Sequence, residues 1–408
     1  MKKLVQINPV IRTTTSTGRI MQEIGIIAES CGWECHIAYS RGRDGVPQED
    51  AGLIPVGNRV SVGLHGLLTR LTDRHGLGSR RATRRFVREL EKIDPDVIHI
   101  HNIHGYFLNY KILFEYLKRS GKPVVWTVHD CWLFTGHCYH YASAGCVKWK
   151  SGCGNCPQKK AFPSSWLIDR SKKNYSDKKK AFTSLGDKLT LVTVSEWMRG
   201  QMKESFLKDC RFEVIHNGID TGRFRPSDPS SFIRKHNLEG KHILLGVASI
   251  WSREKGLDEF VKLYRLLDAN EALVLVGLSD AQAAVLPEGI VKISRTANVE
   301  ELAGIYSAAE VLVNLTLQEN YPTVNLEAVS CGTPVVTYDT GGCRETVSEE
   351  TGTVVPQGDV EAVIGAVRDW ETKDRDDRRL VCRQYAEKHF RKEDRYRDYI
   401  GLYERLTR

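Results

Sequence analysis

The sequence predicts an α/β protein built from two doubly wound, Rossmann-like domains that face each other across a cleft. The first observation is that short apolar runs rich in β-branched residues alternate with helical patterns, as in a parallel sheet covered on both faces. The second is the length of 408 residues, which favours two domains over one. The third is a turn-rich stretch, residues 217–241, after which the same alternation starts again.

The predicted elements follow this alternation along the chain. We place an N-terminal domain at 1–220, a C-terminal domain at 221–390, and a final helix at 391–408 that packs back toward the first domain. Strands are predicted at 4–7, 35–39, 97–101, 124–129, 189–195, 212–216, 243–247, 273–277, 290–293, 311–315 and 335–338. Helices are predicted at 18–30, 107–118, 257–267 and within 374–408.

Composition excludes several classes of protein. With 41% hydrophobic and 27% charged residues, the chain resembles an ordinary soluble globular protein. No stretch is long enough to span a membrane, and only a short strand pattern follows Met1, Lys2 and Lys3, so we expect neither a membrane helix nor a signal peptide. The expected location is cytoplasmic, with the inner face of the cytoplasmic membrane as the alternative.

Positive charge is concentrated in one segment, 70–92, within a chain of net charge +8. This basic segment is either a solvated helix face or a surface for an anionic membrane or a lipid phosphate. No nucleic-acid recognition motif accompanies it, so we expect no nucleic-acid partner. Its basic residues are Arg70, Arg74, Arg80, Arg81, Arg84, Arg85, Arg88 and Lys92.

Two glutamates eight residues apart, Glu319 and Glu327, are the strongest functional signal. The apolar run 311–315 predicts a buried strand before them, and Pro322 suits the first turn of a helix over 323–330. Glu319 would then lie in the loop after the strand, and Glu327 inside the helix. Free N–H groups at the start of the helix form a site for an anion, with one carboxylate on either side of it. This arrangement suits a nucleotide-sugar, which has phosphates in the middle and hydroxyls at both ends.

Several motifs, in their order along nearly the whole chain, resemble those of the retaining family 4 glycosyltransferases, which have the GT-B fold. The resemblance implies a hexosyltransferase-type enzyme (EC 2.4) of the bacterial polysaccharide type, which moves a sugar from a nucleoside-diphosphate sugar to a saccharide or lipid-linked acceptor. It implies no metal or other cofactor for the chemistry, because a helix dipole and cations offset the diphosphate charge. The motifs are 95–101 (PDVIHIH), 127–130 (TVHD), 216–220 (HNGID), Lys255-Gly256, Glu319, Glu327-Ala328 and 331–336 (CGTPVV).

The resemblance assigns separate roles to the two glutamates. Glu327 would hold the ribose hydroxyls of the nucleotide, since a carboxylate accepts two hydrogen bonds from a vicinal diol. Glu319 would contact hydroxyls of the donor sugar. The alternative for Glu327 is a plain carboxylate on the surface of a helix. The donor would also meet the residues between the two, which are Tyr321, Pro322, Thr323 and Val324.

The leaving nucleoside diphosphate needs a positive partner as its charge develops. Relatives in the family use an Arg and a Lys five residues apart, with the Lys before a Gly. Lys255 and Gly256 match, but Ile250 stands where the Arg is expected, and Arg253 is the replacement that we predict. A surface lysine in a loop is the alternative for Lys255.

The N-terminal loop 11–19 corresponds to a glycine-bearing loop of the family that opens a helix and approaches the donor phosphate and the acceptor. Thr17 and Gly18 are the candidates here, although one glycine stands where relatives have a pair. The alternative is a helix N-cap role for Ser16 or Thr17.

His129 ends a predicted strand, and the resemblance implies that it hydrogen-bonds a hydroxyl of the donor sugar. The alternative is a buried histidine satisfied within the sheet. His101 and His104 are candidates for the acceptor side, and Asp130 for orienting the acceptor hydroxyl. No carboxylate is an obvious nucleophile, so we expect same-face substitution, in which a donor phosphate oxygen deprotonates the incoming hydroxyl.

Five of the 11 cysteines cluster in an insertion, 131–157, directly after Asp130. The sequence of 153–156 (CGNC) has the spacing of a zinc-knuckle turn, and two further thiolates would complete a tetrahedral structural zinc site. Disulfides and free thiols are the alternatives. We expect the insertion to overhang the acceptor side and shape acceptor choice. The predicted ligands are Cys138, Cys146, Cys153 and Cys156, with Cys131, His137 and His140 as spare candidates.

Two other functions compete with sugar transfer. A sugar-nucleotide epimerase or a phosphorylase with the same fold is disfavoured by the placement of the two glutamates and by the absence of a pyridoxal-phosphate lysine motif. A metal-containing nucleic-acid-binding protein would use the cysteine cluster and the basic segment, and it predicts salt-sensitive binding to DNA or RNA.

Overall fold

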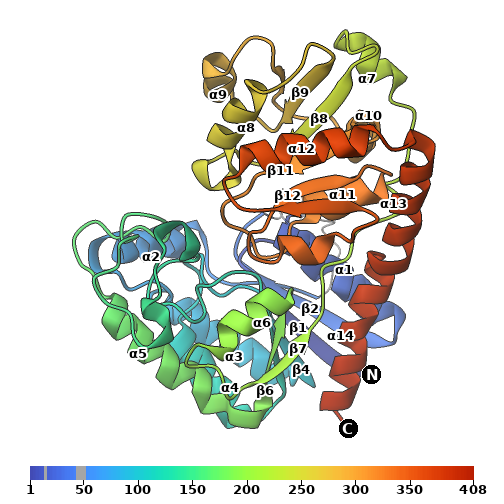
Figure 1. Ribbon diagram of the computed structural model, residues 1–408. Coiled ribbons are helices and arrows are strands. Elements are labelled where there is room, and N and C mark those ends of the chain that lie inside the picture. The colour runs from blue at the N-terminus through green and yellow to red at the C-terminus, as the bar shows by residue number, and fades with distance from the viewer. Residues whose placement is uncertain (13–15, 43–51) are drawn as a thin grey trace. The chain divides into compact units, whose positions relative to one another are not determined.

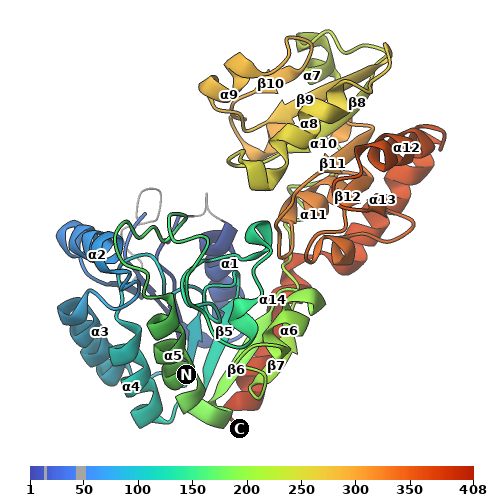
Figure 2. The same ribbon diagram turned by 60° about the vertical axis from the view of Figure 1, so that its left-hand side comes forward.

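The computed structural model describes residues 1–12, 16–42 and 52–408. These residues form two compact units (Figures 1 and 2). The first unit contains Met1–His216 and the chain end Tyr396–Arg408, and the second contains Asn217–Arg395. Each unit is built around one parallel sheet, as the alternation of short apolar runs and helices predicts.

In the described part of the first unit, seven parallel strands form one sheet in the order β3-β2-β1-β4-β5-β6-β7. The sequence predicts six of them, and it misses β3, which has three residues and none fully buried. The strands are β1 (Lys2–Ile7), β2 (Trp33–Tyr39), β3 (Leu53–Pro55), β4 (Val97–Ile100), β5 (Val124–Val128), β6 (Leu189–Thr193) and β7 (Arg211–Val214).

Helices cover both faces of this sheet because its strands alternate their buried side chains. Leu4, Val97 and Val125 pack with α1 and α14 on one face, whereas Val5 and Ile98 pack with α3, α4, α5 and α6 on the other. The helices are α1 (Ser16–Ser30), α2 (Arg59–Thr72), α3 (Arg80–Ile93), α4 (Tyr110–Ser120), α5 (Ser171–Phe182), α6 (Glu196–Lys203) and α14 (Lys392–Leu406). Short 3-10 helices are η1 (Ala142–Ala144), η2 (Lys148–Lys150) and η3 (Thr183–Lys188).

The second unit has a sheet of six parallel strands in the order β10-β9-β8-β11-β12-β13. Its core joins residues of β8, β9, β11 and β12 with α8 and α12. The edge strand β13 was not predicted from the sequence. The strands are β8 (His242–Val247), β9 (Glu271–Val276), β10 (Val291–Ile293), β11 (Val311–Asn314), β12 (Val335–Tyr338) and β13 (Gly352–Val355).

The helices of the second unit include α7, which lies within the turn-rich stretch expected to be a linker. Helix α11 contacts α10 and α13 as well as the strands β11 and β12. The helices are α7 (Ser230–Lys235), α8 (Leu257–Tyr264), α9 (Asp280–Val285), α10 (Val299–Ala308), α11 (Thr323–Ser330), α12 (Val360–Glu371) and α13 (Arg375–His389), with the 3-10 helices η4 (Arg253–Lys255) and η5 (Cys343–Thr346). None of the described helices is long and apolar enough to cross a lipid bilayer.

Each sheet reverses its strand order at one point. In the first unit this point lies between β1 and β4, and in the second between β8 and β11. Ligands of doubly wound sheets bind outside the carboxyl ends of the strands at such a switch point, because the connections on either side run to opposite faces. The connections after β1, β4, β8 and β11 are therefore the places to look for a site.

Candidate active site

Lys255 and Glu319 form an ion pair at the switch point of the second sheet. Lys255 ends η4 in the connection after β8, and Glu319 lies in the connection after β11. The Nζ of Lys255 is 2.6 Å from Oε2 of Glu319, and the side chains are 40% and 20% exposed, so that a ligand can reach both. Oε1 of Glu319 also accepts a hydrogen bond of 2.9 Å from the backbone N–H of Asn320. Two predicted catalytic residues are thus brought together.

Two glycines let the backbone pack closely around this pair. Gly256 has a φ of +76°, and a Cβ there would lie 2.0 Å from the carbonyl oxygen of Leu315. Gly341 has a φ of +57°, and its Cβ would lie 1.7 Å from the carbonyl oxygen of Glu319. Both the left-handed conformation and the lack of space require glycine at these positions. The loop that carries Glu319 is therefore held by backbone contacts from two other loops.

The segment between the two glutamates starts helix α11. Pro322 is the N-cap residue, with an extended ψ of 113°, so the prediction that it lies in the first turn is wrong by one position. Tyr321 is buried beside it, whereas Thr323 and Val324 are partly exposed. The first N–H groups of a helix have no intrahelical acceptor, and they lie at the positive end of its dipole. The start of α11 therefore favours an anion next to Glu319.

Glu327 is buried on α11 and held by a tyrosine. Its side chain accepts a hydrogen bond of 2.8 Å at Oε2 from the hydroxyl of Tyr306, which is fully buried on α10. Thr333 fixes Tyr306 in turn, because its hydroxyl donates to the Tyr306 carbonyl at 2.6 Å. Only 6% of Glu327 is exposed, which excludes a plain surface carboxylate. Sequence reasoning missed Tyr306, since one tyrosine in a helix gives no motif.

The position at which the family resemblance predicts an arginine is open to solvent. Ile250 occupies it and is 76% exposed. Arg253 is exposed on η4, two residues before Lys255. The backbone of η4 is fixed to the next connection, because the N–H of Leu317 donates to the carbonyl of Glu254 at 2.8 Å. An arginine thus lies two residues from Lys255, while an uncharged side chain occupies position 250.

A chain of hydrogen bonds runs along the carboxyl edge of the first sheet. His129 follows β5, and its Nε2 lies 3.1 Å from Nδ1 of His101, which follows β4. Nε2 of His101 lies 3.0 Å from Oε1 of Gln6 on β1. The Gln6 amide donates to the Met21 carbonyl at 2.9 Å, which orients its oxygen toward His101. His101 therefore donates through Nε2 and accepts at Nδ1, and this places the proton of His129 on Nε2.

Both histidines of this chain are neutral at pH 7. Burial lowers the pKa of His129 to about 4, against a smaller raising effect of Asp130. Burial also lowers the pKa of His101 well below its ordinary value. His129 is thus hydrogen-bonded through Nε2 to His101 at the edge of the sheet. Sequence reasoning missed Gln6, which connects the ends of three strands. Its partner His101 is 95 residues away in the sequence.

Asp130 and His104 form a second polar pair beside the first. Nε2 of His104 is 3.1 Å from Oδ2 of Asp130. Burial acts to raise the pKa of Asp130, but the charge and hydrogen bond of His104 and the backbone N–H of Trp132 outweigh it, and the pKa is lowered. Asp130 is therefore a carboxylate at neutral pH, and it is bonded to the histidine that we placed with it on the acceptor side.

Thr17 and Gly18 lie in the first turn of α1 and not in a loop. Helix α1 starts at Ser16, with Thr17 partly exposed and Gly18 buried. Residues 13–15 of the predicted loop lie outside the described residues. Because α1 follows β1, both candidates stand at the same edge of the sheet as Gln6 and His129.

Comparison with known families shows to which kind of protein the chain belongs. Residues 27–223 match the family described as "Glycosyltransferase Family 4", and residues 230–389 match "Glycosyl transferases group 1". The two matches divide the chain nearly where its two compact units divide.

The chain belongs to the family 4 glycosyltransferases of the GT-B fold.

Curated relatives of this glycosyltransferase match over parts of their length. The colanic acid biosynthesis glycosyl transferase WcaC of Escherichia coli is 25% identical over 272 residues, which are 65% of either chain. A GDP-mannose-dependent phosphatidylinositol monomannoside mannosyltransferase of Mycolicibacterium smegmatis is 30% identical over 233 residues, 52% of this chain and 59% of the relative. The chain therefore spans less than two thirds of the length of each of these relatives.

Solved structures share the fold over the whole chain. Sucrose-phosphate synthase from Thermosynechococcus elongatus has a TM-score of 0.70 at 18% identity and covers 100% of this chain and 99% of its own. Anabaena HepE in complex with UDP-glucose has a TM-score of 0.67 at 13% identity, with 98% of this chain and 99% of HepE covered. These likenesses establish the GT-B fold of the glycosyltransferase.

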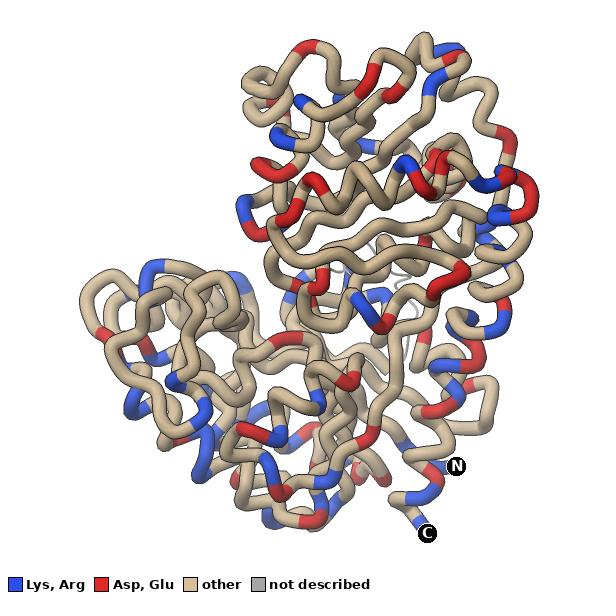
Figure 3. Tube along the Cα trace, viewed as in Figure 1, with Lys and Arg blue, Asp and Glu red and all other residues tan. Residues whose placement is uncertain are grey.

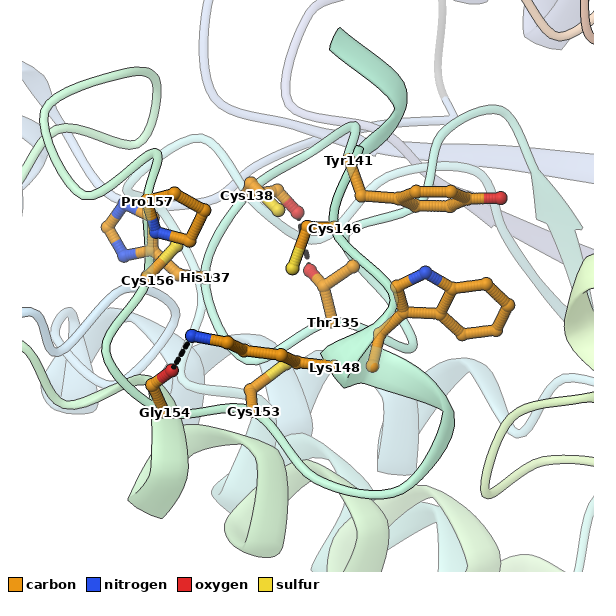
Figure 4. Close-up of a pocket in the computed structure, with 11 residues that line it drawn as sticks. Thr135, His137, Cys138, Tyr141, Cys146, Lys148, Cys153, Gly154, Cys156 and Pro157 are labelled. Carbon is orange, nitrogen blue, oxygen red and sulfur yellow. Dashed lines mark hydrogen bonds between the residues drawn. The ribbon is translucent and has the colours of Figure 1, made fainter. Parts of the chain in front are cut away.

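The cysteine insertion of the glycosyltransferase folds around a pocket of its own. All four predicted zinc ligands line it, together with the spare candidate His137 (Figure 4). The thiols of Cys138 and Cys156 are hydrogen-bonded, which lowers the pKa of Cys156. Across residues 1–12, 16–42 and 52–408, no group of three or more Cys, His, Asp or Glu has the spacing of metal ligands. The eleven cysteines are free thiols in the structure.

Proposed function

We propose that this glycosyltransferase transfers a sugar, with retention at the anomeric carbon, from a nucleoside-diphosphate sugar to a saccharide or lipid-linked acceptor in cell-surface polysaccharide biosynthesis. One observation carries the proposal. The Lys255–Glu319 pair stands at the switch point of the second sheet, next to the start of α11 and followed on that helix by the buried Glu327. A cation and a helix start, with one carboxylate before that start and one after it, match the parts of a nucleotide-sugar.

In this proposal, each part of the donor binds a different one of these groups. Glu327 accepts hydrogen bonds from the ribose hydroxyls, while Tyr306 keeps its carboxylate oriented from behind. The diphosphate lies at the N–H groups of Thr323 and Val324. Lys255 holds it as negative charge develops, with Arg253 as the second cation. Glu319 accepts a hydrogen bond from the ammonium group of Lys255 and so positions it. When the donor binds, the same carboxylate also accepts hydrogen bonds from hydroxyl groups of the sugar.

The chemistry needs no nucleophile from the protein. The bond between the anomeric carbon and the diphosphate oxygen breaks, and the acceptor hydroxyl bonds to the same face of that carbon. Its proton passes to the departing phosphate oxygen. The protein supplies positioning and charge stabilisation, which are large effects in group transfer. We assign to neutral His129 a hydrogen bond to a hydroxyl of the transferred sugar.

The pathway is supported by the names of relatives. WcaC is named for colanic acid biosynthesis, and a Staphylococcus aureus relative, CapM, is named for capsular polysaccharide biosynthesis. The mycobacterial relative is named for a phosphatidylinositol mannoside, which is a lipid. A lipid-linked acceptor would require the enzyme to work at a membrane surface.

Helix α2 provides a surface of the required kind. Four apolar side chains, Val60, Leu64, Leu67 and Leu71, are 68%, 63%, 47% and 37% exposed. Their spacing of four, three and four residues places them on one side of the helix. Such a stripe, beside basic side chains, is typical of helices that lie in the interface of an anionic membrane. We propose that this apolar stripe places the enzyme on the inner face of the cytoplasmic membrane.

A second apolar segment adjoins the stripe. The backbone N–H of Trp166 donates to the carbonyl of Arg70 on α2 at 2.7 Å. Trp166 and its neighbours Leu167 and Ile168 are 56%, 69% and 49% exposed. Arg70 belongs to the basic segment, whose further arginines are exposed, with Arg74 before α3 and the others on it. Lysines and arginines are marked in Figure 3. Apolar anchors and positive charge are thus adjacent at Arg70.

Vesicle binding tests the membrane proposal. Burial of one leucine in the bilayer is worth about 1.5–3 kcal/mol, so Leu64→Glu should weaken binding to phosphatidylglycerol-containing vesicles by at least about 10-fold. Val285→Glu is the matched control, since Val285 is 81% exposed on α9. Equal binding of both variants, or equal binding of the wild type to neutral phosphatidylcholine vesicles, would argue against a membrane surface at α2.

Ligand-induced thermal stabilisation tests the transferase proposal. The protein is screened against UDP, GDP, ADP and their sugars, and we expect stabilisation by one nucleotide series. A donor that stabilises should be hydrolysed slowly, and the product with an accepted acceptor should keep the anomeric configuration of the donor. No stabilisation by any of these compounds, together with salt-sensitive binding of an oligonucleotide, would favour the nucleic-acid alternative instead.

A further inference from the structure

The pocket in the cysteine insertion contains a histidine whose outer nitrogen has no partner. His137 is 2% exposed, and its Nδ1 lies 2.6 Å from Oδ1 of Asp73, which is also fully buried. Its Nε2 is buried without a hydrogen-bond partner. Because Asp73 holds the proton on Nδ1, Nε2 presents a lone pair. A buried polar atom without a partner is costly, so the arrangement calls for a ligand at this nitrogen.

Asp73 is itself rigidly placed. It is the C-cap residue of α2, with a φ of +52°. Its Oδ2 accepts a hydrogen bond of 2.7 Å from the backbone N–H of Arg170, and its carbonyl accepts one of 2.7 Å from the side chain of Asn174. A histidine that ligates a metal through one nitrogen typically donates through the other to such a carboxylate. Asp73 and His137 therefore have the geometry of an outer carboxylate and a metal ligand.

Thiols surround the same pocket. Figure 4 shows Cys138, Cys146, Cys153 and Cys156 placed around one space. The cavity measures about 20 Å³, which is room for one water-sized particle. Cys153 and Cys156 flank a tight turn, in which Asn155 has a φ of +48°. The backbone N–H of Gly136 donates to Sγ of Cys153 at 3.1 Å, a contact that favours a thiolate.

We propose that this pocket binds one zinc ion through Nε2 of His137 and the thiolates of Cys138, Cys153 and Cys156. Three sulfurs and one imidazole nitrogen form one of the ligand sets of structural zinc. No group of three or more such side chains stands at ligand spacing among the described residues, so the proposal requires the thiols to move onto the ion when it binds. Cys146 lines the pocket as well. We choose His137 over Cys146 as the fourth ligand because Nε2 of His137 is buried without a hydrogen-bond partner.

Positive charge around the pocket offsets the thiolates. Lys178 is 2% exposed, and its Nζ donates to the carbonyls of Trp132 and Thr135 at 2.6 and 3.0 Å. Lys148 lines the pocket and donates to the carbonyls of Gly154 and Asn155, each at 3.0 Å. Its bond to Gly154 is drawn in Figure 4. The ammonium group of Lys148, three thiolates and a divalent ion have charges that sum to zero.

The zinc would hold the segment that follows the His129-Asp130 pair. Through Asp73 it is tied to α2, and through Arg170 and Asn174 to the start of α5. The role is structural, and it is independent of sugar transfer, since none of the proposed ligands belongs to the donor site. A zinc-free protein would keep the second unit and its nucleotide binding intact.

Metal analysis of the full-length protein tests the site. Protein purified under reducing conditions with added zinc should retain about one equivalent after dialysis. His137→Gln and Cys156→Ser should each weaken zinc retention at least 10-fold against a competing chelator. Cys31→Ser is the matched control, because Cys31 is an exposed thiol that does not line the pocket, and it should retain zinc like the wild type. Less than about a tenth of an equivalent in the wild type would overturn the proposal.

Cobalt substitution in the wild type tests the ligand set even if a variant fails to fold. The wild type loaded with cobalt(II) should show a thiolate-to-metal charge-transfer band and the visible bands of a tetrahedral centre. Cys146→Ser should keep both, and His137→Gln should change the visible bands. A spectrum without charge transfer, or one that changes with Cys146→Ser and not with His137→Gln, would overturn the assigned ligands. Thiols that pair as disulfides and take up no metal after reduction would overturn the site itself.

Discussion

Replacing Glu327 by alanine should weaken nucleoside-diphosphate binding by about 100-fold. If the buried carboxylate accepts two hydrogen bonds from the ribose, each bond to a charged acceptor is worth about 1.5 kcal/mol, and the pair about 3 kcal/mol. At 1.4 kcal/mol for each factor of ten, this corresponds to somewhat more than 100-fold in Kd. The 6% exposure of Glu327 supports a value of this size, since water competes little at a buried carboxylate.

The substitution also affects stability, and this effect must be separated. Glu327→Ala leaves the buried hydroxyl of Tyr306 without its acceptor, at a cost of about 1–3 kcal/mol. In a unit of this size each kcal/mol lowers Tm by roughly 2–4 °C. Glu259→Ala is the matched control, because Glu259 is a buried carboxylate of the same unit that accepts from the hydroxyl of Tyr338 at 3.0 Å. It should lose similar stability and keep its nucleotide affinity.

Calorimetric titration with the preferred nucleoside diphosphate and its 2′-deoxy analogue is the assay. Removal of one ribose hydroxyl should weaken nucleotide binding to the wild type by about 10-fold. It should hardly change binding to Glu327→Ala, because that variant already lacks the carboxylate to which the hydroxyl donates. If the wild type and Glu327→Ala lose the same factor with the deoxy analogue, Glu327 does not contact the ribose. If Glu259→Ala lost as much nucleotide affinity as Glu327→Ala, the loss of stability alone would explain the effect of Glu327→Ala on affinity.

Three further predictions concern the loops and the pH dependence. Glu319→Ala should lower donor turnover by about 10- to 100-fold and change nucleotide affinity by less than about threefold, because it removes sugar contacts and the orientation of Lys255. Gly341→Ala should lower stability and turnover, since its Cβ would lie 1.7 Å from the Glu319 carbonyl; thermal melting and donor hydrolysis measure both. Burial lowers the pKa of His65 to about 4 from 6.5, so its contribution to stability is full above pH 6.5 and is lost as pH falls toward 4. His65→Gln should therefore flatten the dependence of Tm on pH in that range.

Each of these predictions has its own control. Equal losses of turnover and nucleotide affinity in Glu319→Ala would argue against a sugar contact. Gly358→Ala matches Gly341→Ala, because Gly358 also has a positive φ, +86°, but open space at its Cβ; equal effects of the two would show that only backbone strain matters. For His65, whose Nε2 accepts from the N–H of Gly78 at 3.1 Å, an unchanged slope between pH 4 and 6.5 would contradict a neutral imidazole in the fold.

Much of the architecture could be predicted because it depends on local patterns. Buried parallel strands are short apolar runs, and the runs before Glu319 and His129 were long enough to identify. Elements with weaker patterns were missed: β3 has no fully buried residue, and the edge strand β13 has two that are only partly buried. The position of Pro322 was off by one, since helix caps depend on backbone angles that a sequence does not show.

The sequence by itself predicted the groups of the candidate site, because motif spacing points to Glu319, Glu327 and Lys255 directly. Only the tertiary structure decided which groups meet. The Lys255–Glu319 ion pair joins residues 64 apart, and Gln6 meets His101 across 95 residues. Tyr306 became the support of Glu327 in the same way. Such contacts arise where strands distant in sequence lie side by side in a sheet, and no local pattern of residues records that adjacency.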